Sequence, residues 1–172
     1  MSSRRRNTGS SPRFVVDTST LFSALYKRNG NEARLFEMAH QGKCRIHIPL
    51  YVIEELASVF ARKGIDFGTV LEFLELTDNL YISEIPDMDA PEVDVAKRCI
   101  DDPKDRPVFV AAYMMTHGYG DRDRDRTYLV SGDKTFFSDR AQDALNGKVL
   151  TTRKALEMLE ERPLSRGLPK GR

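Results

Sequence analysis

The stretch that most constrains the fold is FVVDTSTLF, residues 14–22, in which three apolar residues run straight into an acid and a Thr-Ser-Thr turn. A short apolar run that ends at a polar turn is typical of a buried strand. In open α/β sheets, ligands bind outside the carboxyl ends of the strands. We therefore expect Asp17 at the carboxyl edge of a sheet, either as the N-cap of the following helix or as a ligand.

The same arrangement recurs at residues 127–133, where the apolar strand TYLV leads into Ser131, Gly132 and Asp133. Strand and helix patterns alternate along the chain, and this alternation predicts a parallel sheet with helices on both faces. Further strands are predicted at 44–48, 81–83 and 148–151, and helices at 18–26, 32–40, 50–63, 66–76, 91–100, from about 105 onward and at 153–161. The expected fold class is α/β, a single Rossmann-like three-layer domain with about five parallel strands.

The predicted helix 50–63 carries two adjacent acids that differ in orientation. At about 100° per residue, its buried stripe comprises Val52, Ile53, Leu56, Val59 and Phe60. Glu54 lies nearly opposite this stripe, whereas Glu55 lies on its flank. Glu54 is therefore expected in solvent and Glu55 against the body of the protein. The alternative is that both are surface residues that only favour the helical conformation.

The segment DDPKDRP, residues 101–107, precedes a helix that is apolar on nearly all sides. Pro107 fits only the first turn of a helix, so the helix is expected to begin near Asp105. One interpretation is that Asp102 or Asp105 serves only as its cap. However, capping requires one acid, and a buried helix places its N-terminus at the edge of the sheet.

The charge distribution divides the chain into three parts. Residues 1–13 and 162–172 hold four basic residues each and no acid, so the body between them has 19 basic residues against 26 acids, a charge of −7. We expect a disordered basic arm at 1–13, the folded domain at 14–161 and a basic tail at 162–172. The alternating charges of residues 120–126 are expected to be solvated and without chemistry.

An acidic body argues against a broad phosphate-binding face, whereas basic tails can tether a polyanion. Neither a secretory signal nor an apolar run of membrane-spanning length is found, so a cytoplasmic protein that does not enter a membrane is expected. Cys44 and Cys99 lack metal-ligand spacing and are expected as buried thiols. The three histidines are scattered, which gives no support to a histidine-centred mechanism.

Four acids are expected to meet where strand ends and helix starts share one edge of the sheet: Asp17, Glu55, Asp105 and Asp133. Carboxylates this close repel one another unless cations neutralise them. An oxygen-only site suits Mg²⁺ or Mn²⁺. Such an ion can activate water and stabilise displacement at a phosphodiester, so no nucleophilic side chain is needed.

The segments FVVDTSTL, PLYVIEEL, DDPKDRPVFVAA and YLVSGDKTF, in this order, resemble the PIN-domain family, and most closely its toxin-type, VapC-like members. The resemblance covers residues 14–159. It implies a Mg²⁺- or Mn²⁺-dependent ribonuclease that cuts RNA, homodimers and often a small antitoxin partner. The family's four acids match Asp17, Glu55, Asp105 and Asp133, with Ser19, Asp102 and Ser131 as secondary site residues. Thr135 stands where many relatives carry a further acid, which leaves open whether one or two metal ions bind.

Three alternatives compete with a toxin-type endoribonuclease. The family also includes nucleases that process ribosomal or transfer RNA. A haloacid-dehalogenase-like phosphatase would need a second Asp two residues after Asp17, where this chain has Ser19. The third is a non-catalytic interaction module in which the acids are only helix caps.

Overall fold

The computed structural model describes residues 11–84, 90–118 and 122–161. Its strands form one sheet in the order β3-β2-β1-β4-β5, and all neighbouring strands are parallel. The strands are β1 (Arg13–Val16), β2 (Arg45–Pro49), β3 (Leu80–Ser83), β4 (Thr127–Val130) and β5 (Val149–Leu150). The predicted fold class, a five-stranded parallel α/β sheet, is confirmed.

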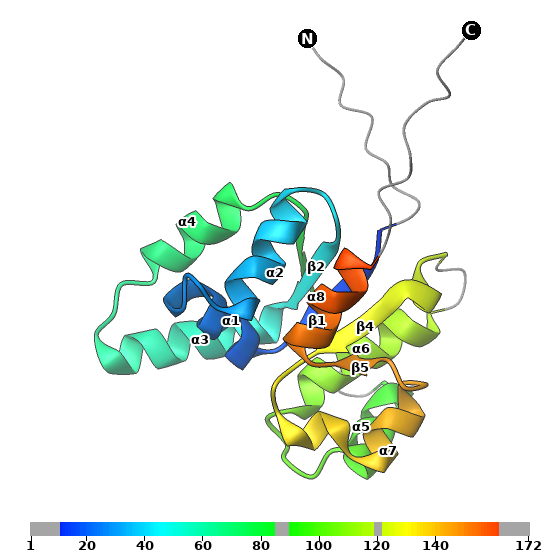
Figure 1. Cartoon of the computed structure of the whole chain (residues 1–172). Coiled ribbons are helices and arrows are strands. Elements are labelled where there is room, and N and C mark those ends of the chain that lie inside the picture. Colours follow the sequence, from blue (N-terminus) through cyan, green and yellow to red (C-terminus); the bar gives the residue numbers. More distant parts are fainter. Residues whose placement is uncertain (1–10, 85–89, 119–121, 162–172) are drawn as a thin grey trace, which may run out of the picture.

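Helices cover both faces of the sheet. The helices are α1 (Thr18–Tyr26), α2 (Asn31–His40), α3 (Leu50–Lys63), α4 (Gly68–Leu76), α5 (Pro91–Cys99), α6 (Arg106–His117), α7 (Asp139–Ala144) and α8 (Thr152–Glu160), with short 3-10 turns η1 (Arg124–Arg126) and η2 (Lys134–Phe137). Helices α2 and α8 pack together on one face, and α6 lies against β1, β2 and β4 on the other, with α5 outside it (Figure 1). The result is the expected three-layer arrangement.

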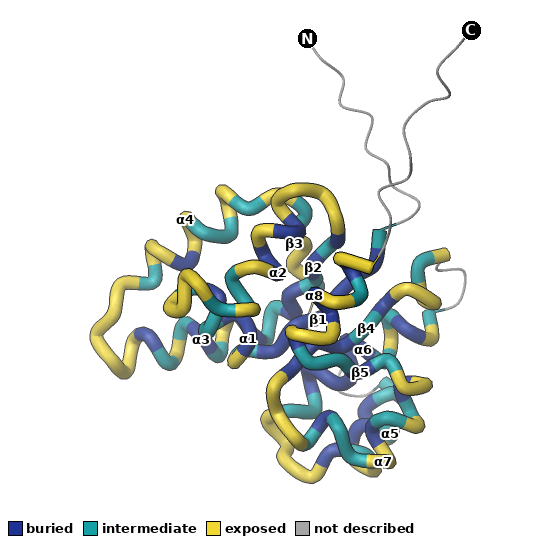
Figure 2. Tube along the Cα trace, in the orientation of Figure 1, coloured by how far each residue is buried: buried dark blue, intermediate teal, exposed yellow. Residues whose placement is uncertain are grey.

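The central strand of the sheet is more buried than its edge strand β3. Every residue of the central strand β1 is buried, whereas Tyr81 and Ile82 of the edge strand β3 are exposed (Figure 2). A strand covered on both faces requires a continuous apolar run, and the FVV of residues 14–16 provides it. The hydrophobic pattern thus places β1 at the centre of the sheet.

The order of the strands places a topological switch point between β1 and β4. From β1 the chain builds outward through β2 to β3, then crosses back and adds β4 and β5 on the other side of β1. In sheets of this kind the crevice at the switch point, outside the carboxyl ends of the strands, is the usual ligand site. Asp17 directly follows β1, and Asp133 lies three residues after β4.

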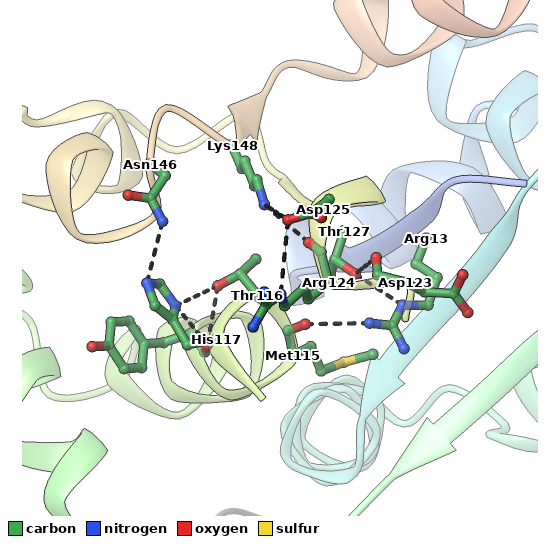
Figure 3. Close-up of polar contacts among 11 residues, drawn as sticks. Arg13, Met115, Thr116, His117, Asp123, Arg124, Asp125, Thr127, Asn146 and Lys148 are labelled. Atoms are coloured by element: carbon green, nitrogen blue, oxygen red, sulfur yellow. Dashed lines mark hydrogen bonds and ion pairs between the residues drawn. The ribbon is translucent and has the colours of Figure 1, made fainter. Parts of the chain in front are cut away.

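At the opposite, amino edge of the sheet, two sequence predictions are wrong. Arg13, assigned to the arm, is a buried residue of β1, and its Nε donates to Thr127 Oγ1 at 2.8 Å (Figure 3). Asp123, expected in a fully solvated segment, forms an ion pair with Arg45 at 3.0 Å in which both side chains are at most 20% exposed. Arg13 can be buried, and Arg45 and Asp123 half-buried, because each of these charged side chains has a partner. Residues 1–10, 120–121 and 162–172 lie outside the described part of the chain.

Both cysteines are free thiols, as predicted. Cys44 is buried, and this burial raises the pKa of its thiol to about 12, so it is unreactive at neutral pH. Cys99 is only half-buried, so the prediction of a buried thiol is confirmed for Cys44 and wrong for Cys99. Among the described helices, none has the length and apolar character needed to cross a membrane.

Candidate active site

Asp17 is held by three donors at the end of β1. Its Oδ1 accepts the Thr20 backbone N–H at 2.8 Å, its Oδ2 accepts the Ser131 hydroxyl, and Ser19 Oγ lies 3.1 Å from both oxygens. The side chain is thus the N-cap of α1, and the residue is only 6% exposed. A carboxylate has about four lone-pair positions, so capping does not exhaust its capacity as an acceptor.

Ser131 connects the two strands that flank the switch point. It is fully buried, donates its hydroxyl to Asp17 and accepts the backbone N–H of Asp133 at 2.9 Å on the same oxygen. These two bonds tie the turn after β4 to the turn after β1. Asp133 itself is exposed, and its Oδ1 accepts the Thr135 N–H at 2.8 Å.

Glu55 is the inward acid of α3, as the helix periodicity predicted. It is half-buried and accepts the Thr18 hydroxyl, whereas Glu54 is exposed. Because Thr18 immediately follows Asp17, this bond joins α3 to the first turn of α1. Val52, Leu56 and Phe60 of the predicted stripe are buried, and Ile53 and Val59 are half-buried.

Asp105 occupies the N-cap position of α6 but makes no capping hydrogen bond, because its own backbone is in the helical region. Asp102 is exposed and accepts the Lys104 N–H at 2.9 Å, which closes a turn before the helix. Capping therefore does not account for the Asp105 carboxylate. Pro107 lies in the first turn of the helix, where its missing N–H costs nothing.

Burial and neighbouring acids raise the pKa of Asp105 to about 6. Desolvation is the largest cause, and Asp133, Asp102, Asp17 and Glu55 add to it in that order. Every charge that acts on Asp105 is thus another carboxylate. The four predicted site acids lie close enough to one another for this effect, at the same edge of the sheet.

The groups at this edge suit a hard divalent cation, because the acids offer only oxygen atoms as ligands. The charges that shift the pKa of Asp105 are all negative. Within residues 11–84, 90–118 and 122–161, no three Asp, Glu, His or Cys side chains approach closely enough to form a ready-made metal cage. The acids are therefore electrostatic neighbours rather than a closed ligand set. Their role in metal binding stays a prediction.

Two polar residues of this edge escaped the sequence analysis. Thr18 was grouped with the small turn residues, although its hydroxyl contacts Glu55. Tyr51 lies one turn before Glu55, and its pKa is raised by burial and then by Glu55, Asp105 and Asp102. Tyr51 could have been identified from its i, i+4 spacing to Glu55, which places the two side chains on the same face of the helix.

An open parallel sheet with carboxylates gathered at its switch point defines a Rossmann-like α/β protein with an acidic site. Residues 13–134 match the PIN domain, so the chain belongs to the PIN domain family, a family of nucleases. The matched range includes all four acids.

Eight chains of solved structures match, among them one described as "VapBC2 from Rickettsia felis bound to a DNA fragment from their promoter". It superimposes with a TM-score of 0.55 at 14% sequence identity and covers 81% of this chain and 98% of its own. At this identity the likeness supports the fold. A comparison with curated proteins found no match.

Proposed function

We propose that this protein is a Mg²⁺- or Mn²⁺-dependent endoribonuclease that hydrolyses RNA phosphodiesters at the carboxyl edge of its sheet. The observation that carries this proposal is Asp105, a helix-start acid that caps nothing and whose pKa is raised to about 6 by burial and by four further carboxylates. Holding these acids together without a cation is unfavourable, so the arrangement is best explained by a positively charged ligand.

Asp17, Glu55 and Asp105 would hold the ion, and Asp133 would complete the site or orient the attacking water. A bound Mg²⁺ or Mn²⁺ lowers the pKa of water and stabilises the charge that develops at the phosphate. Ser131 and Ser19 fix the orientation of Asp17, and Thr18 fixes that of Glu55. The half-buried position of Asp105 strengthens its attraction for a cation, because the local dielectric constant is lower than in water.

The direct test is cleavage of structured and unstructured RNA by the full chain with Mn²⁺, with and without excess EDTA. We expect cleavage that EDTA abolishes and renewed Mn²⁺ restores. In parallel, Mn²⁺ is expected to raise the melting temperature, because a ligand that binds only the folded state stabilises it. A folded protein whose melting temperature is unaffected by millimolar Mn²⁺ would instead favour a non-catalytic interaction module.

Two matched substitutions in α3 distinguish an acid of the site from an acid of the surface. Glu55→Gln is expected to lower kcat/KM by about 10²-fold, because the amide removes a negative charge from the metal site. Glu54→Gln, one position away and exposed, is expected to retain wild-type activity. Equal activities of the two variants would remove Glu55 from the site.

We further propose that the chain is the toxin of a toxin–antitoxin pair, acting as a homodimer with a small antitoxin partner. The motif order of the VapC-like members and the fold shared with a VapBC2 chain support this proposal. Induced expression in a bacterial host is expected to arrest growth, and Asp17→Asn is expected to relieve the arrest. Unimpaired growth with active enzyme would favour a role in processing ribosomal or transfer RNA.

A further inference from the structure

Tyr51 lies in the first turn of α3, at the same edge of the sheet as the acids. Helix α3 begins directly after β2 ends at Pro49, so its N-terminal turn is at the carboxyl edge. Tyr51 precedes Glu55 by four residues, which makes the two side chains neighbours on one face of the helix. The residue is half-buried, so part of it reaches solvent at this edge.

The start of α6 also faces this side chain. Helices α3 and α6 pack against each other, and Asp105 and Asp102 precede the first residue of α6. Burial raises the pKa of Tyr51, and Glu55, Asp105 and Asp102 raise it further. A tyrosine hydroxyl, whose ordinary pKa is about 10, is protonated at neutral pH whether or not this shift applies, and it is therefore a hydrogen-bond donor.

The ring of Tyr51 packs against the hydrophobic core, which leaves the hydroxyl as its free end. In the described part of the chain, this hydroxyl has no hydrogen-bond partner. A donor with no partner at a solvent-accessible edge is available for a ligand. The neighbouring carboxylates can only accept hydrogen bonds, and they repel a phosphate.

We propose that the Tyr51 hydroxyl donates a hydrogen bond to a phosphate oxygen of the bound RNA strand and so positions the strand over the acids. The inference rests on the proposed function, because it assumes that RNA binds at this edge. A neutral donor can approach a phosphate without adding charge to a site already crowded with carboxylates. Tyr51 is thus a substrate-binding residue, distinct from the acids that hold the ion.

The test measures the Kd of a fluorescein-labelled single-stranded RNA by anisotropy, with Ca²⁺ replacing Mn²⁺ and intact RNA verified on a gel. Tyr51→Phe, which removes only the hydroxyl, is expected to raise Kd about tenfold through the loss of a hydrogen bond to a charged group. Tyr26→Phe is the control, because Tyr26 ends α1, is 50% exposed and stacks on Phe22. Its Kd is expected to stay within about twofold of wild type, the usual scale for a surface change.

Equal Kd values for wild type and Tyr51→Phe would overturn the inference, as would a wild-type chain that binds no RNA. A wild-type chain that binds RNA but does not cleave it with Mn²⁺ would overturn the proposed function instead, and the Kd comparison would still decide the role of Tyr51. Melting temperatures and the Mn²⁺-induced stabilisation are expected to be the same in both tyrosine variants and wild type. A lower Mn²⁺ affinity in Tyr51→Phe would assign the residue to the metal site and contradict a phosphate contact.

Discussion

Asp17→Asn is expected to lower the RNA cleavage rate by about 10³-fold, corresponding to roughly 4 kcal/mol of transition-state stabilisation. Asn retains the shape of Asp and is an equally good N-cap, so its Oδ1 can still accept the Thr20 N–H. Its Nδ2 can donate to Ser131, whose hydroxyl oxygen can accept. The variant therefore loses the charge of Asp17 and keeps the N-cap bond, whereas the bond to Ser131 is kept only with its direction reversed.

The melting temperature separates the two roles of Asp17. We expect Asp17→Asn to unfold within a few °C of wild type without metal, and to gain less stability from Mn²⁺. Asp17→Ala removes the cap as well and is expected to cost about 1 kcal/mol of stability in addition to activity. Full activity of Asp17→Asn would mean that the acid is only a cap and would remove it from the site.

Asp105→Asn is expected to stabilise the metal-free protein at pH 7 while abolishing Mn²⁺-dependent cleavage. The pKa of this carboxyl is about 6 in the folded state, against 3.8 for an unperturbed aspartate side chain. The folded state therefore binds more protons between these values, and stability falls as the pH rises through this window. Because the group is partly exposed, we expect a gain of about 1 kcal/mol in the variant, or about 2–4 °C in melting temperature.

The pH dependence provides the check. At pH 4, where Asp105 of the wild type is protonated, the two proteins are expected to have similar stabilities, and their difference is expected to open by pH 7. Asp101→Asn is the control, because Asp101 is exposed and lies outside the carboxylates that act on Asp105. A variant that is less stable than wild type at pH 7 would mean that the Asp105 carboxylate makes a net favourable contact in the metal-free protein.

The regular part of the fold was predictable because it depends on local patterns. The helices 18–26 and 50–63 were predicted with the boundaries observed for α1 and α3, and β1 was recognised as buried from its continuous apolar run. Helix α7 was not predicted, since six residues are too few for a helical period to emerge. The helical periodicity of α3 also predicted correctly that Glu55, and not Glu54, is the inward-facing acid.

Residues whose environment is set by distant partners could not be predicted in this way. Arg13 is buried because Thr127, 114 positions away, accepts its hydrogen bond, and Asp123, just before η1, forms an ion pair with Arg45 of β2. Periodicity says nothing about such pairs. The same holds for the hydroxyl of Thr18 on Glu55, which depends on the packing of α1 against α3.

The hydrogen bond between Ser131 and Asp17 also has a consequence for synthesis of the protein. Its two residues are 114 positions apart, and the strands they follow must pair before the acids can gather. Pairing between distant strands is slow compared with local helix formation. A nascent chain that has emerged only through α5 already contains Asp17 and Glu55, but it lacks Asp105, Asp133 and the strand that joins them to β1. We therefore expect ribosome-bound fragments to be inactive, with activity arising only when β4 docks late in translation.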